Sequence, residues 1–248
     1  MNTNALKDLD LYGVRWELSE ISENQGPHRA PTQQFFQTND AKEEKTVVVP
    51  ASAPISLDTV KSMVARPTDT DSLIRMVCEF NHPLKAGATN TVVPNIAIKP
   101  NGLLIITDFP GTDDDLSGRI LSGIAGDMTD KMLAAIGMSR ENVSITPLLF
   151  WRTPGGRTPT REELDLSIPF VDKMIEMLNP RVIITFGTLA TTEITKHNLN
   201  DVHGNEITDD MGRVIIPIYH PNYLVLKPSA KRDVWNALQN VQKLLKNA

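Results

Sequence analysis

Hydrophobic residues follow two alternating patterns from about residue 71 onward. Four short runs are almost wholly apolar, as is typical of strands buried on both faces: 102–109, 143–146, 181–187 and 213–220. Elsewhere apolar positions step by three and four residues, which predicts helices over 71–80, 128–136, 160–178, 188–197 and from residue 229. This alternation predicts an α/β fold, a three-layer α/β/α sandwich with a mostly parallel sheet of about four strands.

The helix ends carry recognisable signals. Thr160 precedes the clearest helix, and Glu163 three residues later allows a capping box in which each side chain binds the other's backbone N–H. Gly137 is placed to end the helix that contains Met132. A short helix is also expected after Ser56, whose hydroxyl can cap the run before Pro67 stops it.

The first 70 residues differ from the rest. Apolar positions Leu9, Tyr12, Trp16 and Leu18 allow a short helix, but residues 21–55 are polar, contain prolines and lack a sustained period. We therefore expect an N-terminal extension over 1–70, partly disordered with short helices, and a folded domain over 71–248.

Composition narrows the class of protein. The chain has 248 residues of which 40% are hydrophobic, enough for a real core, and no apolar run approaches the roughly 18 to 20 residues that span a bilayer. The polar, acid-containing start lacks the plan of a secretory signal, so we expect a cytoplasmic protein. A net charge of −5 gives no overall attraction to nucleic acid. The single cysteine, Cys78, excludes an intrachain disulfide and a Cys-ligated metal cluster.

In parallel sheets, ligands sit beyond the carboxyl ends of the strands. After the first predicted strand, Asp108 stands where a general base or a water-positioning carboxylate would be, followed by the Pro110-Gly111 turn. The triplet 113–115 is acidic and could hold a hard cation. Turn residues without chemistry would give the same pattern.

Two later loops are basic. Trp151 with the arginines Arg152, Arg157 and Arg161 combines an aromatic ring with cations, a pairing that suits phosphates and bases. His220 precedes a second basic run with Lys227, Lys231 and Arg232. A solvated basic surface and a hydrogen-bonded structural histidine are the alternatives.

Taken together, the order of segments from about Asp71 to Leu245 resembles the uracil-DNA glycosylase superfamily, most closely its family 4 type and alphaproteobacterial relatives. TDFPGTDDDLSGR is similar to the family's Gly-Glu-Ala-Pro-Gly motif with its acidic pair and Gly-Arg. The stretch from ITPLLFWRTPGG to RVIITFG follows the family's strand, Pro- and Arg-rich loop, helix and strand ending in Gly. YHPNYLVLKPSAKRDVW resembles its His-Pro motif and basic tail.

The resemblance implies a DNA repair hydrolase that swings a damaged base out of the duplex and breaks its glycosidic bond. It places Asp108 at the position of a water-positioning carboxylate and His220 at that of the histidine that donates to the base. The implied substrate pocket comprises Phe109, Pro110, Gly111, Leu121, Thr146 and Pro147. The implied DNA contacts are Arg152, Arg157, Asn222, Tyr223, Lys227, Lys231 and Arg232.

The departures from the family pattern are specific. Asp108 replaces a longer glutamate and Phe109 a small alanine, while Leu121 stands where a phenylalanine stacks on uracil. Pro147 replaces the asparagine that reads the uracil edge, so uracil selectivity should collapse unless another residue substitutes. Trp151 and Ser167 occupy two positions of iron–sulfur cysteines, and Cys78 lies out of register with the others. We expect no metal and no cofactor.

Three functions remain open on the sequence. The chain could be an active glycosylase for uracil or a related deaminated base, because the carboxylate and histidine are retained. It could be a catalytically silent relative that binds DNA or a repair protein. It could also keep only the fold and contact a protein partner through its N-terminal extension. A monomer without membrane association is expected in each case.

Overall fold

The computed structural model describes residues 56–246, and they contain one five-stranded sheet in the order β2-β1-β3-β5-β4. The four parallel strands are β1 (Leu103–Thr107), β2 (Ser144–Pro147), β3 (Val182–Phe186) and β5 (Val214–Ile218). A two-residue strand, β4 (Ile207–Thr208), pairs antiparallel with β5 at the sheet edge. The mostly parallel sheet expected from the sequence is confirmed, with β4 as an addition.

Both faces of this sheet are buried. Leu104 and Ile106 of β1 pack into one core, whereas Leu103 and Ile105 of the same strand pack into a second core on the other face. The pattern follows from the two-residue period of a strand, which sends successive side chains to opposite faces. Apolar runs without polar alternation are therefore the correct sequence signal for this sheet.

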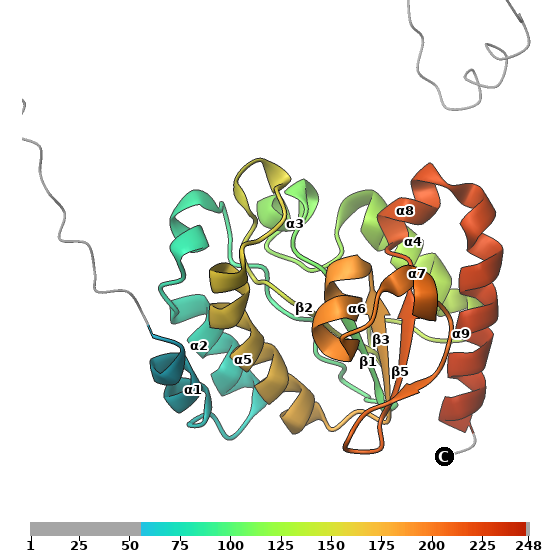
Figure 1. Cartoon of the computed structure of the whole chain (residues 1–248), viewed down its shortest axis with the longest axis horizontal. Coiled ribbons are helices and arrows are strands. Elements are labelled where there is room, and N and C mark those ends of the chain that lie inside the picture. The colour runs from blue at the N-terminus through green and yellow to red at the C-terminus, as the bar shows by residue number, and fades with distance from the viewer. Residues whose placement is uncertain (1–55, 247–248) are drawn as a thin grey trace, which may run out of the picture. The chain divides into compact units, whose positions relative to one another are not determined.

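Helices cover the two faces separately (Figure 1). One core is covered by α1 (Leu57–Val64), α2 (Thr70–Glu79), α5 (Arg161–Leu178) and α6 (Thr188–Thr195). The other core is covered by α4 (Gly123–Ala135), α8 (Pro221–Leu226) and α9 (Lys231–Lys246). Two short helices, α3 (Thr112–Ser117) and α7 (Leu199–Val202), lie in the connections. The resulting order of layers is helix, sheet, helix, as predicted.

The helix caps follow the sequence signals closely. Thr160 and Glu163 form the expected capping box at the start of α5. Ser56 accepts a hydrogen bond from Thr59 N and caps α1, and Gly137 has the positive φ of +74° expected after α4. Short 3₁₀ turns at Pro83–Gly87, Pro154–Gly156 and Pro228–Ala230 complete the connections.

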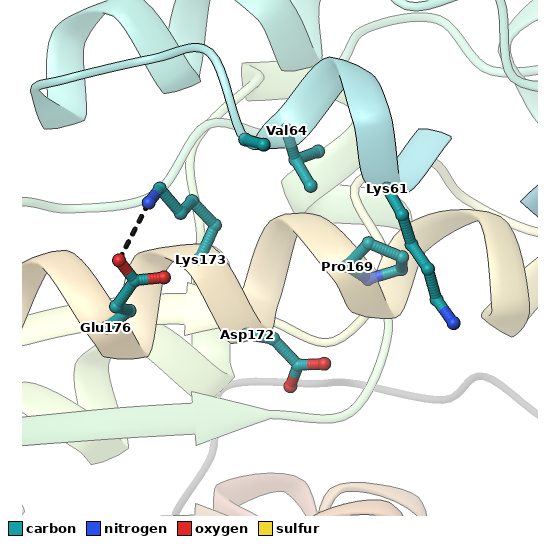
Figure 2. Close-up of a pocket in the computed structure, with 7 residues that line it drawn as sticks. Lys61, Val64, Pro169, Asp172, Lys173 and Glu176 are labelled. Carbon is teal, nitrogen blue, oxygen red and sulfur yellow. Dashed lines mark hydrogen bonds and ion pairs between the residues drawn. The ribbon is translucent and has the colours of Figure 1, made fainter. Parts of the chain in front are cut away.

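Helix α1 packs against α5 although it precedes residue 71. Val60 and Val64 of α1 are buried in the same core as Phe170 and Met174 of α5. Beside this contact the two helices border a groove, in which Lys173 Nζ pairs with Glu176 Oε1 at 2.8 Å (Figure 2). The domain boundary expected between residues 70 and 71 stays a prediction, but α1 shares the core of the sheet domain.

Several features were not expected from the sequence. The sequence predicts a loop after β5, yet Pro221–Leu226 is helical, and its patterns predict none of α3, α7 and β4. The helix expected near Leu9 and the linker over 21–55 lie outside the described residues. In the part of the chain that the structure describes, no helix has the length and apolar character needed to cross a membrane.

Candidate active site

Three loops meet at the carboxyl ends of the central strands. Asp108 directly follows β1, Gly187 directly follows β3, and His220 lies two residues after β5. Because β3 is paired with β1 on one side and β5 on the other, these strand ends lie side by side. The sheet topology therefore gathers a carboxylate and an imidazole from positions 112 residues apart in the sequence.

The Asp108 carboxylate caps helix α6. Its Oδ1 accepts a hydrogen bond from Ala190 N at 2.7 Å, within the first turn of the helix. Gly187 occupies the N-cap position and has no side chain to do this itself. Gly187 also has a φ of +98°, and a Cβ there would collide with Asp108 Oδ2. Glycine at 187 thus makes room for a carboxylate that ties β1 to α6.

Burial raises the pKa of Asp108 to about 6, and the backbone N–H groups of Ala190 and Leu189 oppose that shift only in part. Burial disfavours the charged form, whereas hydrogen bonds donated to the carboxylate favour it. Asp108 is therefore mostly ionised at pH 7 but accepts a proton more readily than an ordinary aspartate, which suits a general base.

His220 is held at both ring nitrogens. Nδ1 accepts a hydrogen bond from Asn222 N at 3.2 Å, so the imidazole caps helix α8. Nε2 lies 3.1 Å from Thr107 Oγ1. Burial lowers the pKa of His220 to about 4, so the ring is neutral near pH 7. With Nδ1 acting as acceptor, the proton of the neutral ring is assigned to Nε2.

Asp108 and His220 line two adjoining clefts. The first has a volume of about 310 Å³ and the second about 340 Å³. The first is also lined by Phe109, Pro110, Gly111, Thr112, Asp114, Ala125, Arg152, Gly156 and Asn222. The second is also lined by Gly187, Thr188, Leu199, Asn200, Tyr219 and Tyr223. Seven of the site residues expected from the sequence therefore line the first cleft, and Tyr223 lines the second.

Arg152 and Arg157, which precede α5, differ in their surroundings. Arg157 forms a bidentate pair with Glu163, with Nη2–Oε1 and Nη1–Oε2 distances of 2.5 and 2.8 Å. Arg152 lines the first cleft, and its buried Nε has no hydrogen-bond partner among residues 56–246. An unpaired buried donor on a cation is costly, so Arg152 is the arginine that is ready to receive an anion.

The remaining expected DNA contacts belong to α8, its end and the start of α9, and we call them the rim residues. Asn222, Tyr223 and Lys227 belong to α8 and its end, and the Lys227 ammonium stands 5.7 Å from the Tyr223 ring centroid. Lys231 and Arg232 are exposed at the start of α9. Helix α8 thus carries the rim residues from the His220 ring toward the basic start of α9.

Three residues expected in the substrate pocket lie elsewhere. Leu121 is only 2% exposed and packs in the core beneath α4, with a positive φ of +50°. Thr146 and Pro147 are buried within β2. None of the three lines either cleft in the described part of the chain. Pro147 ends β2 beside Thr107 of β1, and Leu148 N donates to Asp108 O at 3.0 Å. The end of β2 therefore contacts the backbone of the site, while the side chains of Thr146 and Pro147 stay buried.

Asp114 and Asp115 of the acidic triplet serve the local backbone. Asp114 accepts hydrogen bonds from Gly111 N at 2.9 Å and Ser122 N at 2.6 Å. Asp115 accepts from Thr89 N at 2.8 Å and Asn90 N at 3.2 Å. Within residues 56–246 no three potential metal-ligating side chains gather in one place. The alternative of a cation site at this triplet therefore has no support, because two of its carboxylates organise loops.

The region expected to replace the iron–sulfur cluster is packed with aromatic rings. Trp151 is fully buried and stacks on His82 with 4.4 Å between ring centroids. Ser167 Oγ donates to Leu148 O at 2.9 Å. Cys78 is the one cysteine of the chain. These residues do not fit a cysteine-ligated cluster, since a buried indole and a hydroxyl already bound to a carbonyl take the place of thiolates.

Comparison with known proteins agrees with this geometry. Residues 95–239 match the family model of the uracil DNA glycosylase superfamily, and the chain belongs to that superfamily. Its relatives include a type-4 uracil-DNA glycosylase of Archaeoglobus fulgidus, 30% identical over 61% of this chain and 81% of the relative. A type-4 uracil-DNA glycosylase of Thermotoga maritima is 31% identical over 66% of this chain and 88% of the relative. The chain is a divergent, family-4-like member.

Sequence reasoning missed part of the site. Thr107 ends β1 and contacts His220, Gly187 accommodates Asp108, and Tyr219 lines the second cleft. Gly187 had a readable signal, a glycine directly after a buried strand. Thr107 had none, since a threonine in an apolar strand is ordinary and its contact joins residues 113 positions apart.

Proposed function

We propose that this protein is a DNA glycosylase that hydrolyses the N-glycosidic bond of uracil, or of a related deaminated base, after the base has been flipped out of DNA. The observation that carries the proposal is the pairing of Asp108 and His220 on the walls of the same clefts, one with a raised pKa and one neutral. Groups whose environments move their pKa values apart are typical of acid–base sites.

The reaction assigns a task to each group. The bond between the sugar C1′ and the base nitrogen breaks, its electron pair leaves with the base, and a water oxygen bonds to C1′. The Asp108 carboxylate holds that water, accepts its proton and faces the positive charge that develops on the sugar. The neutral His220 donates its Nε2 proton to the base oxygen on which negative charge develops.

Arg152 supplies a binding group for the DNA backbone. Its cationic side chain lines the first cleft and is not held by a carboxylate among residues 56–246 as Arg157 is, and a phosphate next to the flipped nucleotide has the required charge. Lys227, Lys231 and Arg232 extend this basic character along the rim, which compensates locally for the net charge of −5. Phosphate contacts of this kind position the protein without reading sequence.

Base recognition must differ from that of relatives with an asparagine at position 147. Pro147 is buried and offers no side-chain hydrogen bond, whereas the Asn222 amide lies on the wall of the first cleft. We propose that Asn222 contacts the substrate there. An amide offers both a donor and an acceptor, the combination needed to read a base with adjacent C=O and N–H groups.

The test is a strand-incision assay on oligonucleotides that carry uracil, hypoxanthine, xanthine or no lesion, with alkali to cleave abasic sites. Asp108→Asn is the decisive variant, because the asparagine Oδ1 can still accept from Ala190 N while the charge is lost. We expect cleavage of at least one lesion by the wild type and a loss of about 10² to 10⁴-fold in Asp108→Asn.

Asp210→Asn is the matched control, since Asp210 is exposed and lies in the β4–β5 turn. It should cleave like the wild type. Full activity in Asp108→Asn would remove Asp108 from the mechanism. Salt-dependent DNA binding by a wild type that cleaves none of the lesions would assign the chain to the silent binding class.

The cytoplasmic location, the monomeric state and a protein partner for the N-terminal extension stay predictions from the sequence. Analytical ultracentrifugation of the full chain at several concentrations would test the monomer directly.

A further inference from the structure

Thr107 occupies a fixed position behind His220. It is 2% exposed, and its backbone is held in the sheet between Pro147 of β2 and Phe186 of β3. Its carbonyl also accepts a hydrogen bond from Leu148 N at 2.8 Å. The hydroxyl that meets His220 Nε2 at 3.1 Å is therefore presented by rigid backbone on a β-branched side chain, which has few rotamers.

The direction of this hydrogen bond follows from the other side of the ring. A backbone N–H can only donate, so the contact from Asn222 N makes His220 Nδ1 an acceptor. In the neutral imidazole the remaining proton is then on Nε2, and it is donated to Thr107 Oγ1. One proton thus serves Thr107 in the free protein, and the proposed mechanism requires the same proton for the base.

We propose that Thr107 is a positioning residue that competes with the substrate base for the Nε2 proton of His220, and thereby sets which bases gain from binding. This inference rests on the function proposed above. A base must offer an oxygen that is a better acceptor than the threonine hydroxyl before exchange is favourable. Hydrogen bonds to charged acceptors are roughly twice as strong as neutral ones, so the developing anion of the leaving base wins this exchange most clearly.

The competition predicts selection by chemistry rather than by shape. A deaminated base carries a carbonyl oxygen that takes up negative charge as the glycosidic bond breaks, and it can displace Thr107. Adenine has no carbonyl oxygen and can offer the Nε2 proton only a ring nitrogen, so it displaces Thr107 less readily. Thr107 therefore disfavours engagement of His220 by a base without an oxygen acceptor.

The test uses Thr107→Val, which keeps the shape and the β-branch but removes the hydroxyl, and Thr107→Ser, which retains it. Without its competitor the Nε2 proton is free for the base. We expect kcat/KM on the lesion that the wild type cleaves best to rise about two- to tenfold in Thr107→Val, the range set by one neutral hydrogen bond. Thr107→Ser should return it to the wild-type value. An unchanged or lower kcat/KM in Thr107→Val would overturn the competition.

Thr185→Val controls for the loss of a buried hydroxyl as such. Thr185 is fully buried in β3, and its Oγ1 pairs with Thr191 Oγ1 at 2.9 Å without touching His220. Long-range ¹H–¹⁵N spectra of the histidine rings report the chemical shift of His220 Nε2, which a general loss of stability would not change. The Nε2 signal of His220 should shift in Thr107→Val and stay in place in Thr185→Val; a signal unmoved in both would contradict the proposal.

Binding of free uracil separates this inference from the proposed function. Calorimetric titration should give a dissociation constant that is two- to tenfold lower in Thr107→Val than in the wild type. Tighter binding without DNA cleavage would uphold the competition and reject the glycosylase. Cleavage by the wild type, together with the same uracil affinity in wild type and Thr107→Val, would uphold the glycosylase and reject the competition. Failure of every variant to bind uracil or to cleave DNA would reject both.

Discussion

Two His-Pro pairs in this protein form the same local structure in two different settings. His82 and His220 each accept, at Nδ1, a backbone N–H from two residues further on, and each caps the helical turn that follows. His82 is buried against Trp151, and its Nε2 contacts Glu163 O at 3.0 Å. His220 lines two clefts, and its Nε2 contacts a hydroxyl.

The difference between the two histidines lies in what surrounds the second nitrogen. The second nitrogen of His82 is hydrogen-bonded to the Glu163 carbonyl of helix α5. The ring lies in an aromatic cluster formed by Phe80, Phe150, Trp151 and Phe170. His220 opens onto space large enough for a ligand. A histidine motif therefore acquires a function from the cavity beside it, and the same motif without a cavity stabilises the fold.

The largest expected effect is a loss of stability in the aromatic cluster around His82. Trp151→Ala should lower the free energy of unfolding by about 3 to 5 kcal/mol, because a fully buried indole and its stack on His82 are lost. Trp235→Ala is the matched control, since Trp235 is 39% exposed, and it should cost much less. Urea denaturation measures both, and equal losses would contradict the assignment of Trp151 as the central core residue of this region.

Substitution of each histidine by asparagine compares the two histidines directly. The asparagine oxygen can replace Nδ1 as the helix cap, but no atom of asparagine replaces Nε2. His220→Asn should lower kcat about 10² to 10³-fold through loss of one donor to the leaving base. His82→Asn should leave kcat unchanged and cost about 1 to 3 kcal/mol of stability, because Glu163 O loses its partner. Incision rates and thermal melts of the two variants would show a reversed pattern if the roles were exchanged.

Low pH should reduce the glycosylase activity through protonation of Asp108. Because burial raises the pKa of Asp108 to about 6, kcat/KM should fall tenfold per pH unit below that value. His220 remains neutral until its pKa of about 4, so the first acid limb belongs to Asp108. The limb should vanish from the residual activity of Asp108→Asn, and a limb retained there would assign it to another group.

Stability should respond to pH in the opposite direction at Asp108. A folded-state pKa raised from 3.8 to about 6 means that the folded chain binds more protons in that interval than the unfolded chain. The contribution of Asp108 to the free energy of unfolding therefore increases as pH falls from 6 toward 4 and is lost again as pH rises. Denaturation of wild type and Asp108→Asn at both pH values isolates this contribution.

Arginine 152 and arginine 157 sharpen the comparison on the basic loop. Arg152→Ala should weaken DNA binding on the order of tenfold, since its unpaired cation faces the cleft. Arg157→Ala breaks an exposed pair with Glu163 and should change stability by at most about 1 kcal/mol. Fluorescence anisotropy on one lesion oligonucleotide measures the DNA affinity of both variants, and urea denaturation measures the stability of Arg157→Ala. An equal loss of affinity in the two variants would assign Arg157 to the DNA contact as well.

The smallest effect concerns the rim. Lys231 is exposed at the start of α9, so Lys231→Ala should weaken binding a few-fold across all DNA sequences. The slope of log K against log salt should decrease by about 1, as expected for one lost phosphate contact. An unchanged slope would contradict a phosphate role for Lys231.

The sequence predicted what depends on periodicity and on short-range caps. The buried strands were readable because runs such as LLIIT are apolar on both faces, and α5 because Thr160 and Glu163 lie three residues apart. Helix α8 was missed although Pro221 stands at its first turn, a place where proline is favoured, because the preceding histidine is an uncommon cap.

The residues of the site were predictable where a motif carried them and not where packing decides. Asp108, His220 and Arg152 were found from their loops, and all three line the first cleft. The family resemblance implies that Leu121 and Pro147 line the pocket, but both side chains are buried, Leu121 at a left-handed turn and Pro147 at the end of β2. The Thr107–His220 contact depends on the order of strands in space, which no local pattern encodes.

The dual duty of Asp108 has an evolutionary consequence. Helix α6 needs an acceptor at position 108, and Gly187 leaves space for its side chain, so selection for folding alone is satisfied by asparagine as well as by aspartate. Only selection for chemistry distinguishes the two, since asparagine has no charge to give. The presence of an ionisable side chain at position 108 in one lineage, against an amide in another, would therefore record which lineages kept the reaction.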